Sequence, residues 1–252
     1  MTPPFTGFIS EIEHRVLSVK PTIPDGISAA YIGGRQSRLT FHGLKVPVIR
    51  KIRKDGFSFS SLPHSAQFKI WTEVWKCSAI YEVKSVALDW IMDRTQLPLV
   101  KERWPVLQKW ALQVDNWAHA DGLCSLYARL LEDEPKLVYP VLQKWNKHPS
   151  PWMRRMSIVS LLYYAAQRER VLPVSKILSL VKPLLSENHH YIQKAVGWTL
   201  RECHTVFPSP TMSFIRKHVG EISATAFSAV IERMTPKDKK ELKADRQSLR
   251  LS

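Results

Sequence analysis

Apolar residues recur at helical spacing along most of the chain, and patterns typical of strands are nearly absent. One clear stripe consists of Ile158, Leu161, Leu162 and Ala165, which occupy positions i, i+3, i+4 and i+7 of one helix face. The Pro-Ser-Pro at 149–151 that precedes it is a typical helix start. No Asn-Gly or Asp-Gly turn joins two alternating apolar runs. The pattern predicts an all-α protein.

A seven-residue phrase occurs twice in the chain. WPVLQKW at 104–110 returns as YPVLQKW at 139–145, and Trp117 and Trp152 repeat the same 35-residue spacing. Two weaker copies flank them: YEVKSVAL, which begins at Tyr81, and YIQKAVGW, which begins at Tyr191. Periods of about 34 to 47 residues are typical of stacked helix pairs, which bury their apolar faces against one another. We therefore expect a helical-repeat solenoid in which each copy opens a helix with an aromatic residue.

The repeats set the expected organisation of the chain. Residues 1–235 are predicted to form one domain, with an N-terminal helical cap at 1–60 and repeats at 61–235. The segment 236–252, PKDKKELKADRQSLRLS, is polar and basic. Its composition predicts a solvated helix end or a disordered tail.

Charge points to a polyanionic partner. The chain has 37 Lys and Arg against 22 Asp and Glu, a formal net charge of +15. Such an excess favours nucleic acid, although a basic surface that only aids solubility is the simpler alternative. A membrane surface is less favoured, because no basic amphipathic anchor stands beside a lipidation signal.

The cysteines and the N-terminus indicate the compartment. Cys77, Cys124 and Cys203 are scattered and form no CxxC motif, which indicates a reducing environment. The N-terminal residues lack the pattern of a signal peptide, and no stretch reaches eighteen uninterrupted apolar residues. We expect a cytoplasmic protein.

One helix face combines aromatic and basic side chains. In a solenoid the second helix of each pair lines the concave side, so its first aromatic and the residues three, four and seven later share that face. These positions hold Tyr81, Lys84, Ser85, Trp117, Asp121, Cys124, Trp152, Arg155, Val159, Tyr191, Lys194, Trp198 and Arg201. Cations suit phosphates and flat rings suit sugars or bases. Packing for the tryptophans and ion pairing for the charged residues are the competing interpretations.

Four segments resemble a known family. They are FHGLKVPVIRKI (41–52), DNWAHAD (115–121), PWMRR (151–155) and YIQKAVGWTLRE (191–202). The chain resembles the AlkD-type DNA alkylation-repair glycosylases, which are built from HEAT-like repeats, over about residues 27–235. The resemblance implies a bacterial, nucleoid-associated monomer that excises positively charged N3- or N7-alkylated purines from duplex DNA without flipping the base.

The resemblance also implies residue roles. Trp117 and Trp198 would contact the deoxyribose of the lesion, Asp121 would lie beside its C1′, and Arg155 would hold a backbone phosphate. We therefore expect three catalytic residues: Asp121, Trp117 and Trp198. The expected DNA-binding residues are Arg155, Lys194, Arg201, Trp152, Tyr191, Lys84 and Tyr31. Ala118 and His119 depart from the more acidic pattern of the family.

Other chemistries are weakly supported. The sequence has no GxxxxGK[ST] loop, GxSxG elbow or HExxH motif, and His189 and His190 are adjacent rather than spaced for metal binding. We expect no metal and no organic cofactor. Two alternatives stay open: a non-catalytic solenoid that binds DNA structures or a protein partner, and an RNA- or tRNA-binding scaffold.

Overall fold

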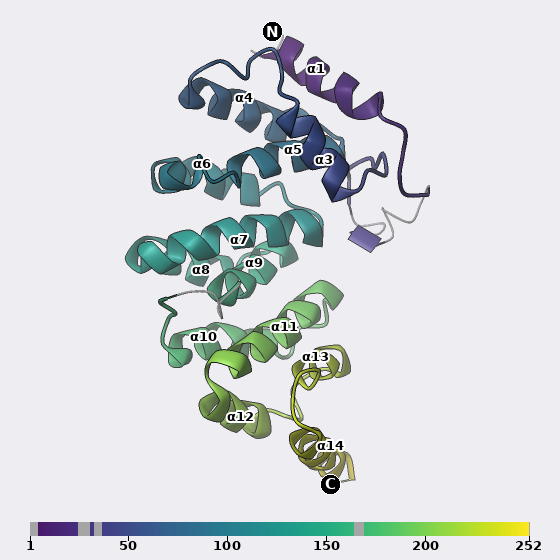
Figure 1. Ribbon diagram of the computed structural model, residues 1–252. Helices are drawn as coiled ribbons and strands as arrows, with labels where there is room; N and C mark the ends of the chain where they lie inside the picture. The colour runs from purple at the N-terminus through teal and green to yellow at the C-terminus, as the bar shows by residue number, and fades with distance from the viewer. Residues whose placement is uncertain (1–4, 25–30, 33–36, 164–168, 252) are drawn as a thin grey trace. The chain divides into compact units, whose positions relative to one another are not determined.

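The computed structural model describes residues 5–24, 31–32, 37–163 and 169–251. Over these ranges the chain forms thirteen α-helices, two short 3-10 helices and no strand, so the all-α prediction is confirmed (Figure 1). A single isolated bridge pairs Thr40 with Ile80. No helix in the described part of the chain combines the length and the apolar character needed to cross a bilayer.

Two compact units divide the chain, Met1–Leu123 and Cys124–Ser252. The first holds α1 (Thr6–Leu17), α3 (Val46–Lys54), α4 (His64–Cys77), α5 (Tyr81–Ile91), η2 (Leu97–Leu99), α6 (Val100–Ala111) and the start of α7 (Trp117–Asp133). The second holds the rest of α7, α8 (Pro135–Trp145), α9 (Pro151–Leu162), α10 (Val174–Val181), η4 (Lys182–Leu184), α11 (His190–Val206), α12 (Pro208–Lys217), α13 (Ala224–Val230) and α14 (Pro236–Leu251). The stacking of helix pairs into a solenoid with a basic concave face stays a prediction.

The repeated phrase forms the same local structure twice. It lies in α6 and in α8, with a proline inside each helix and a buried tryptophan near each C-terminal end. In the first copy Trp110 stacks on Trp75 at 4.7 Å, and the Trp75 indole N–H donates to the Trp110 carbonyl at 3.1 Å. Aromatic residues open α5 and α7 and stand second in α9 and α11, as the repeat predicts. Ala165, the last residue of the predicted stripe, lies outside the described residues.

A buried carboxylate holds the segment that leads into α3. Glu82, on α5, accepts backbone N–H groups from His42 at 2.9 Å, Gly43 at 2.8 Å and Leu44 at 3.3 Å. Gly43 has φ 86°, and a Cβ there would lie 2.8 Å from the carbonyl oxygen of Ile23. Only glycine fits both this backbone conformation and this contact. The chain before α3 is therefore fixed to α5.

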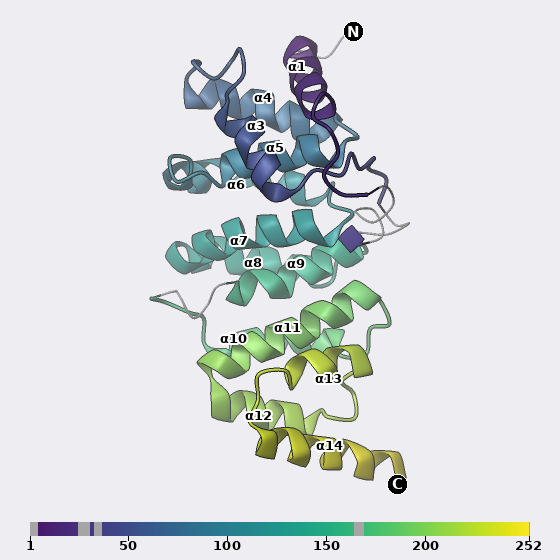
Figure 2. The ribbon, with the colours of Figure 1, turned by 45° about the vertical axis from the view of Figure 1, so that its right-hand side comes forward.

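The second unit is built around α11, which packs against α9, α10, α12 and α13. Gly197 brings α11 close to α13, because a Cβ at this position would lie 2.5 Å from the carbonyl oxygen of Ala226. The polar segment after residue 235 forms α14, which lies beside α12 and α13 (Figure 2). Leu242 is fully buried, and Arg246 lies over the Phe227 ring at 4.7 Å. The tail is thus a packed helix, which its composition did not indicate.

Candidate functional site

An exposed aromatic pair marks the start of α7. The indole N–H of Trp117 donates to the carbonyl oxygen of Tyr31 at 2.7 Å, and the two rings meet edge to face at 5.3 Å. Tyr31 is 70% exposed, and Trp117 is half-buried. The structure therefore brings together two residues that the sequence assigned to DNA contact from distant segments.

Asp121 lies on the same helix, four residues after Trp117. This spacing places the carboxylate one turn on, on the same face as the indole. Asp121 is half-buried, and Gly122 beside it lets α5 approach closely, since a Cβ there would lie 2.5 Å from Cδ2 of Leu88. A carboxylate and an exposed aromatic pair thus share one part of the first unit.

Side chains just before α7 fix its first turn. Asn116 accepts the backbone N–H of His119 at 2.9 Å, which is the geometry of an N-cap. Asp115 accepts the Ser37 hydroxyl at 2.9 Å and the backbone N–H of Arg38 at 2.6 Å. The helix that carries Trp117 and the segment that follows Tyr31 are therefore tied to each other by side chains.

His119 is the buried support of this turn. Its ring stacks on Tyr81 at 4.5 Å, its Nδ1 accepts from the amide of Asn116 at 3.1 Å, and its Nε2 donates to Ser85 at 2.9 Å. These roles follow from the hydrogen-bond network, because the Ser85 hydroxyl donates onward to the Tyr81 carbonyl. Burial, and then the positive charge of Lys84, lower the His119 pKa to about 3. The imidazole is therefore neutral at physiological pH.

Lys84 is not on the surface where the repeat pattern placed it. It is only 5% exposed, and its ammonium lies 5.4 Å from the centre of the Trp75 ring. Burial lowers its pKa, and the largest opposing influence is the negative charge of Asp115. The cation is enclosed by the first unit, and this burial disfavours the predicted phosphate contact at Lys84.

A second group of predicted residues lies in the second unit. Arg155, on α9, is 7% exposed and donates from Nη1 to the carbonyl oxygen of Tyr191 at 2.7 Å. Trp152 is also buried, with its ring 5.0 Å from that of Tyr191. These three residues join the starts of α9 and α11. Their observed contacts are internal, in agreement with the packing interpretation of the tryptophan.

The remaining predicted residues follow one another along α11. Lys194 is exposed, and the half-buried Trp198 lies 5.7 Å from Tyr163 between ring centres. Arg201 pairs with Glu202 at 3.2 Å and with Glu232. Its charge is therefore compensated, and Lys194 is the exposed cation of this helix.

Several residues that position or contact the predicted site residues were not predicted from the sequence. Asn116 and His119 carry a weak signal, an N-cap residue three positions before a histidine. Tyr163 and Glu232 carry none, because they meet Trp198 and Arg201 only in the folded unit.

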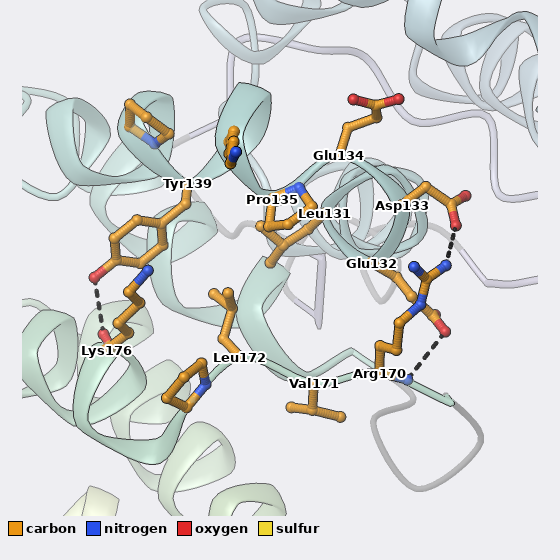
Figure 3. Close-up of a pocket in the computed structure, with 13 residues that line it drawn as sticks. Leu131, Glu132, Asp133, Glu134, Pro135, Tyr139, Arg170, Val171, Leu172 and Lys176 are labelled. Atoms are coloured by element: carbon orange, nitrogen blue, oxygen red, sulfur yellow. Dashed lines mark hydrogen bonds and ion pairs between the residues drawn. The ribbon is translucent and has the colours of Figure 1, made fainter.

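A separate groove of about 800 Å³ lies in the second unit, between the end of α7, the start of α8 and residues 170–176 (Figure 3). Lys176 lies over the Tyr139 ring, and Arg170 pairs with Asp133 at 3.1 Å. The walls carry three acidic and three basic side chains, so the groove has no preference for an anion. None of the predicted site residues lines it. In the described part of the chain, no cluster of three or more His, Cys, Asp or Glu residues is placed to hold a metal ion.

The sequence model of the DNA alkylation repair enzyme family matches residues 27–234. The chain belongs to the DNA alkylation repair enzyme family. The resemblance seen in the four sequence segments is thus confirmed at the level of the family, and a DNA alkylation repair enzyme acts on DNA. No match was found among the curated proteins. All ten predicted site residues lie inside the family match, whereas α14 lies outside it.

Proposed function

We propose that this DNA alkylation repair enzyme is a monofunctional DNA glycosylase that releases positively charged N3- or N7-alkylated purines from duplex DNA. It would act as a monomer in the bacterial cytoplasm, as the first step of base excision repair on nucleoid DNA, and without flipping the base. One observation carries the proposal: Asp121 lies one turn after Trp117, whose half-buried ring is held in place by Tyr31.

The proposed reaction needs few protein groups. An alkylated purine already carries positive charge, so the C1′–N bond breaks with its electron pair going to the base, which leaves neutral. Positive charge then develops on the deoxyribose, as in other glycoside hydrolyses. The Asp121 carboxylate stabilises this oxocarbenium-like sugar and orients a water molecule. The water oxygen bonds to C1′, and its proton passes to the carboxylate or to solvent.

The aromatic residues would stabilise the same developing positive charge on the deoxyribose. Ring faces attract positive groups, so the Trp117 indole would favour the cationic edge of the sugar. Tyr31 fixes the orientation of that indole through its carbonyl. On the resemblance alone, Trp198 is assigned a second contact of this kind.

Phosphate binding rests on fewer residues than the sequence indicated. Lys194 is exposed, whereas Lys84 is enclosed and Arg201 is ion-paired. Arg155 is held by the Tyr191 carbonyl, so its guanidinium has a fixed orientation toward any phosphate that it binds.

The test is release of free 7-methylguanine and 3-methyladenine from methylated duplex DNA. We expect release by the wild type and a loss of about 10²-fold or more in rate for Asp121→Asn, with DNA binding retained. Asp133→Asn is the matched control, because it changes an exposed carboxylate at the other end of the same helix. Its rate should equal that of the wild type.

Two results would contradict the proposal. If the wild type binds the duplex and releases no base, the chain is a non-catalytic DNA-binding protein. If RNA displaces methylated duplex DNA at equal concentration, the substrate class is wrong.

A further inference from the structure

Helix α14 is a folded element that follows the residues matched by the family model. The family match ends at residue 234, and α14 runs from Pro236 to Leu251. One face of the helix is anchored: Leu242 is fully buried, and Arg246 donates to the carbonyl oxygens of Val219 at 3.3 Å and Ile222 at 2.6 Å. The opposite face is therefore held in a defined orientation (Figure 2).

Two of the acidic residues of α14, Asp238 and Glu241, have side-chain partners on one side of the helix. Asp238 accepts the Thr235 hydroxyl at 2.6 Å, and the Asp238 backbone N–H donates back to that hydroxyl, which caps the helix. Glu241 pairs with Arg216 of α12 at 2.5 Å. On a helix of 3.6 residues per turn, Asp238, Glu241 and Asp245 fall on one flank.

The lysines fall on the other flank. Lys237, Lys240 and Lys243 are exposed and follow one another at three-residue intervals, and we call them the lysine edge. None of the three has an acidic partner among the described residues. A rise of about 1.5 Å per residue spreads the lysine edge over roughly 9 Å. One DNA strand carries a phosphate about every 3.4 Å of helix axis, so this length matches two to three phosphates.

The charge of the chain is also concentrated in this unit. Residues 124–252 hold 21 of the 37 Lys and Arg but only 11 of the 22 Asp and Glu. Much of this basic charge is engaged in ion pairs and carbonyl contacts, as for Arg155 and Arg201. The lysine edge is a group of cations that the fold leaves exposed together.

We propose that the lysine edge binds the sugar–phosphate backbone of duplex DNA, as a sequence-independent contact made outside the residues that the family model matches. The inference rests on DNA as the substrate and does not depend on glycosylase activity. Each bound phosphate releases condensed counterions, so the contact contributes affinity that falls steeply with salt.

The experiment measures binding of an undamaged duplex at several salt concentrations by fluorescence anisotropy. In the triple variant Lys237→Gln, Lys240→Gln and Lys243→Gln, the slope of log K against log salt should fall in magnitude by about two to three. The corresponding triple Lys→Arg variant keeps the charge and should keep the slope. A second control removes three exposed lysines elsewhere, Lys69→Gln, Lys109→Gln and Lys144→Gln, and should also keep it.

Either of two outcomes overturns the proposal: an unchanged slope in the first triple variant, or an equal fall in the second control. Melting temperatures check that each variant is folded, and the exposed positions make a large change unexpected. Undamaged DNA holds no alkylated base to release, so the binding measurement does not depend on glycosylase activity. A protein without glycosylase activity would still show the slope difference, so the two proposals fail separately.

Discussion

The indole N–H of Trp117 donates to the carbonyl oxygen of Tyr31 at 2.7 Å, across 86 positions of sequence. The bond attaches an N-terminal residue that lies before α3 to the first turn of α7. It uses the backbone of Tyr31, so the phenol stays free of this contact and is 70% exposed. The aromatic pair is therefore positioned by one side-chain donor.

Replacing that donor should loosen the pair. Trp117→Phe keeps an aromatic ring but removes the N–H, and we expect a loss of about 0.5–1.5 kcal/mol in the free energy of unfolding, measured in urea. Tyr31→Phe is the matched control, because it keeps the backbone acceptor. Equal destabilisation by the two changes would show that ring packing, and not the hydrogen bond, holds the pair.

Replacing Lys194 and replacing Arg155, two of the predicted cations of the second unit, should have different effects on stability. Lys194→Ala should flatten the salt dependence of DNA binding by about one counterion and change stability by less than about 0.5 kcal/mol. Arg155→Ala should flatten it similarly and also lower stability, because the Tyr191 carbonyl loses its buried donor. Salt titrations and urea unfolding of both variants provide the measurement. A salt slope that does not change in Lys194→Ala would exclude that lysine as a phosphate contact.

The buried imidazole of His119 should make stability depend on pH. Its folded pKa of about 3 lies below the ordinary histidine pKa of 6.5, so the unfolded chain takes up the proton first as pH falls. The stability due to neutral His119 is complete above about pH 6.5 and is lost on acidification toward pH 3. Between pH 7 and pH 5 this amounts to about 2 kcal/mol.

A substitution isolates this contribution. His119→Gln should be less stable at pH 7 but should lack the 2 kcal/mol loss, as measured by urea unfolding at both pH values. His190→Gln changes an exposed histidine and should behave as the wild type. If the free energy of unfolding changed equally with pH in the wild type and in His119→Gln, the pH dependence could not be assigned to His119.

Two helical glycines should differ in their tolerance of a methyl group. Gly197→Ala places a Cβ 2.5 Å from a backbone oxygen of α13, which cannot move independently, and overpacking of this kind costs about 1–3 kcal/mol. Gly122→Ala meets only the end of the flexible Leu88 side chain, and alanine gains up to about 1 kcal/mol of helix propensity. Thermal melting should therefore rank Gly197→Ala well below Gly122→Ala. The reverse order would show that α11 and α13 can separate without cost.

The sequence predicted the helices well because the repeat carries their boundaries. Aromatic residues recur at the starts of α5, α7, α9 and α11, and each helix begins within one residue of its aromatic marker. The pairing of Trp117 with Asp121 also follows from spacing alone, because four residues are about one helical turn.

Side-chain exposure was less predictable. Lys84 shares its helix with buried residues on nearly every side, so periodicity could not distinguish an exposed face on α5. The partners of Arg155 and Arg201, Tyr191 and Glu232, are distant in sequence and meet them only by folding. Among the described side chains of α14, Leu242 is the buried leucine, and one buried position gives no apolar period to detect.

The contacts of α14 also distinguish the end of the family match from the end of the packed unit. A chain cut after Met234 would keep all ten site residues predicted from the sequence, since they lie inside the family match, and would lose the lysine edge. It would also uncover the Phe227 ring and leave the carbonyls of Val219 and Ile222 without the Arg246 guanidinium. The packed unit therefore extends beyond the matched residues, and a deletion chosen from the family match alone would remove a helix on which its neighbours pack.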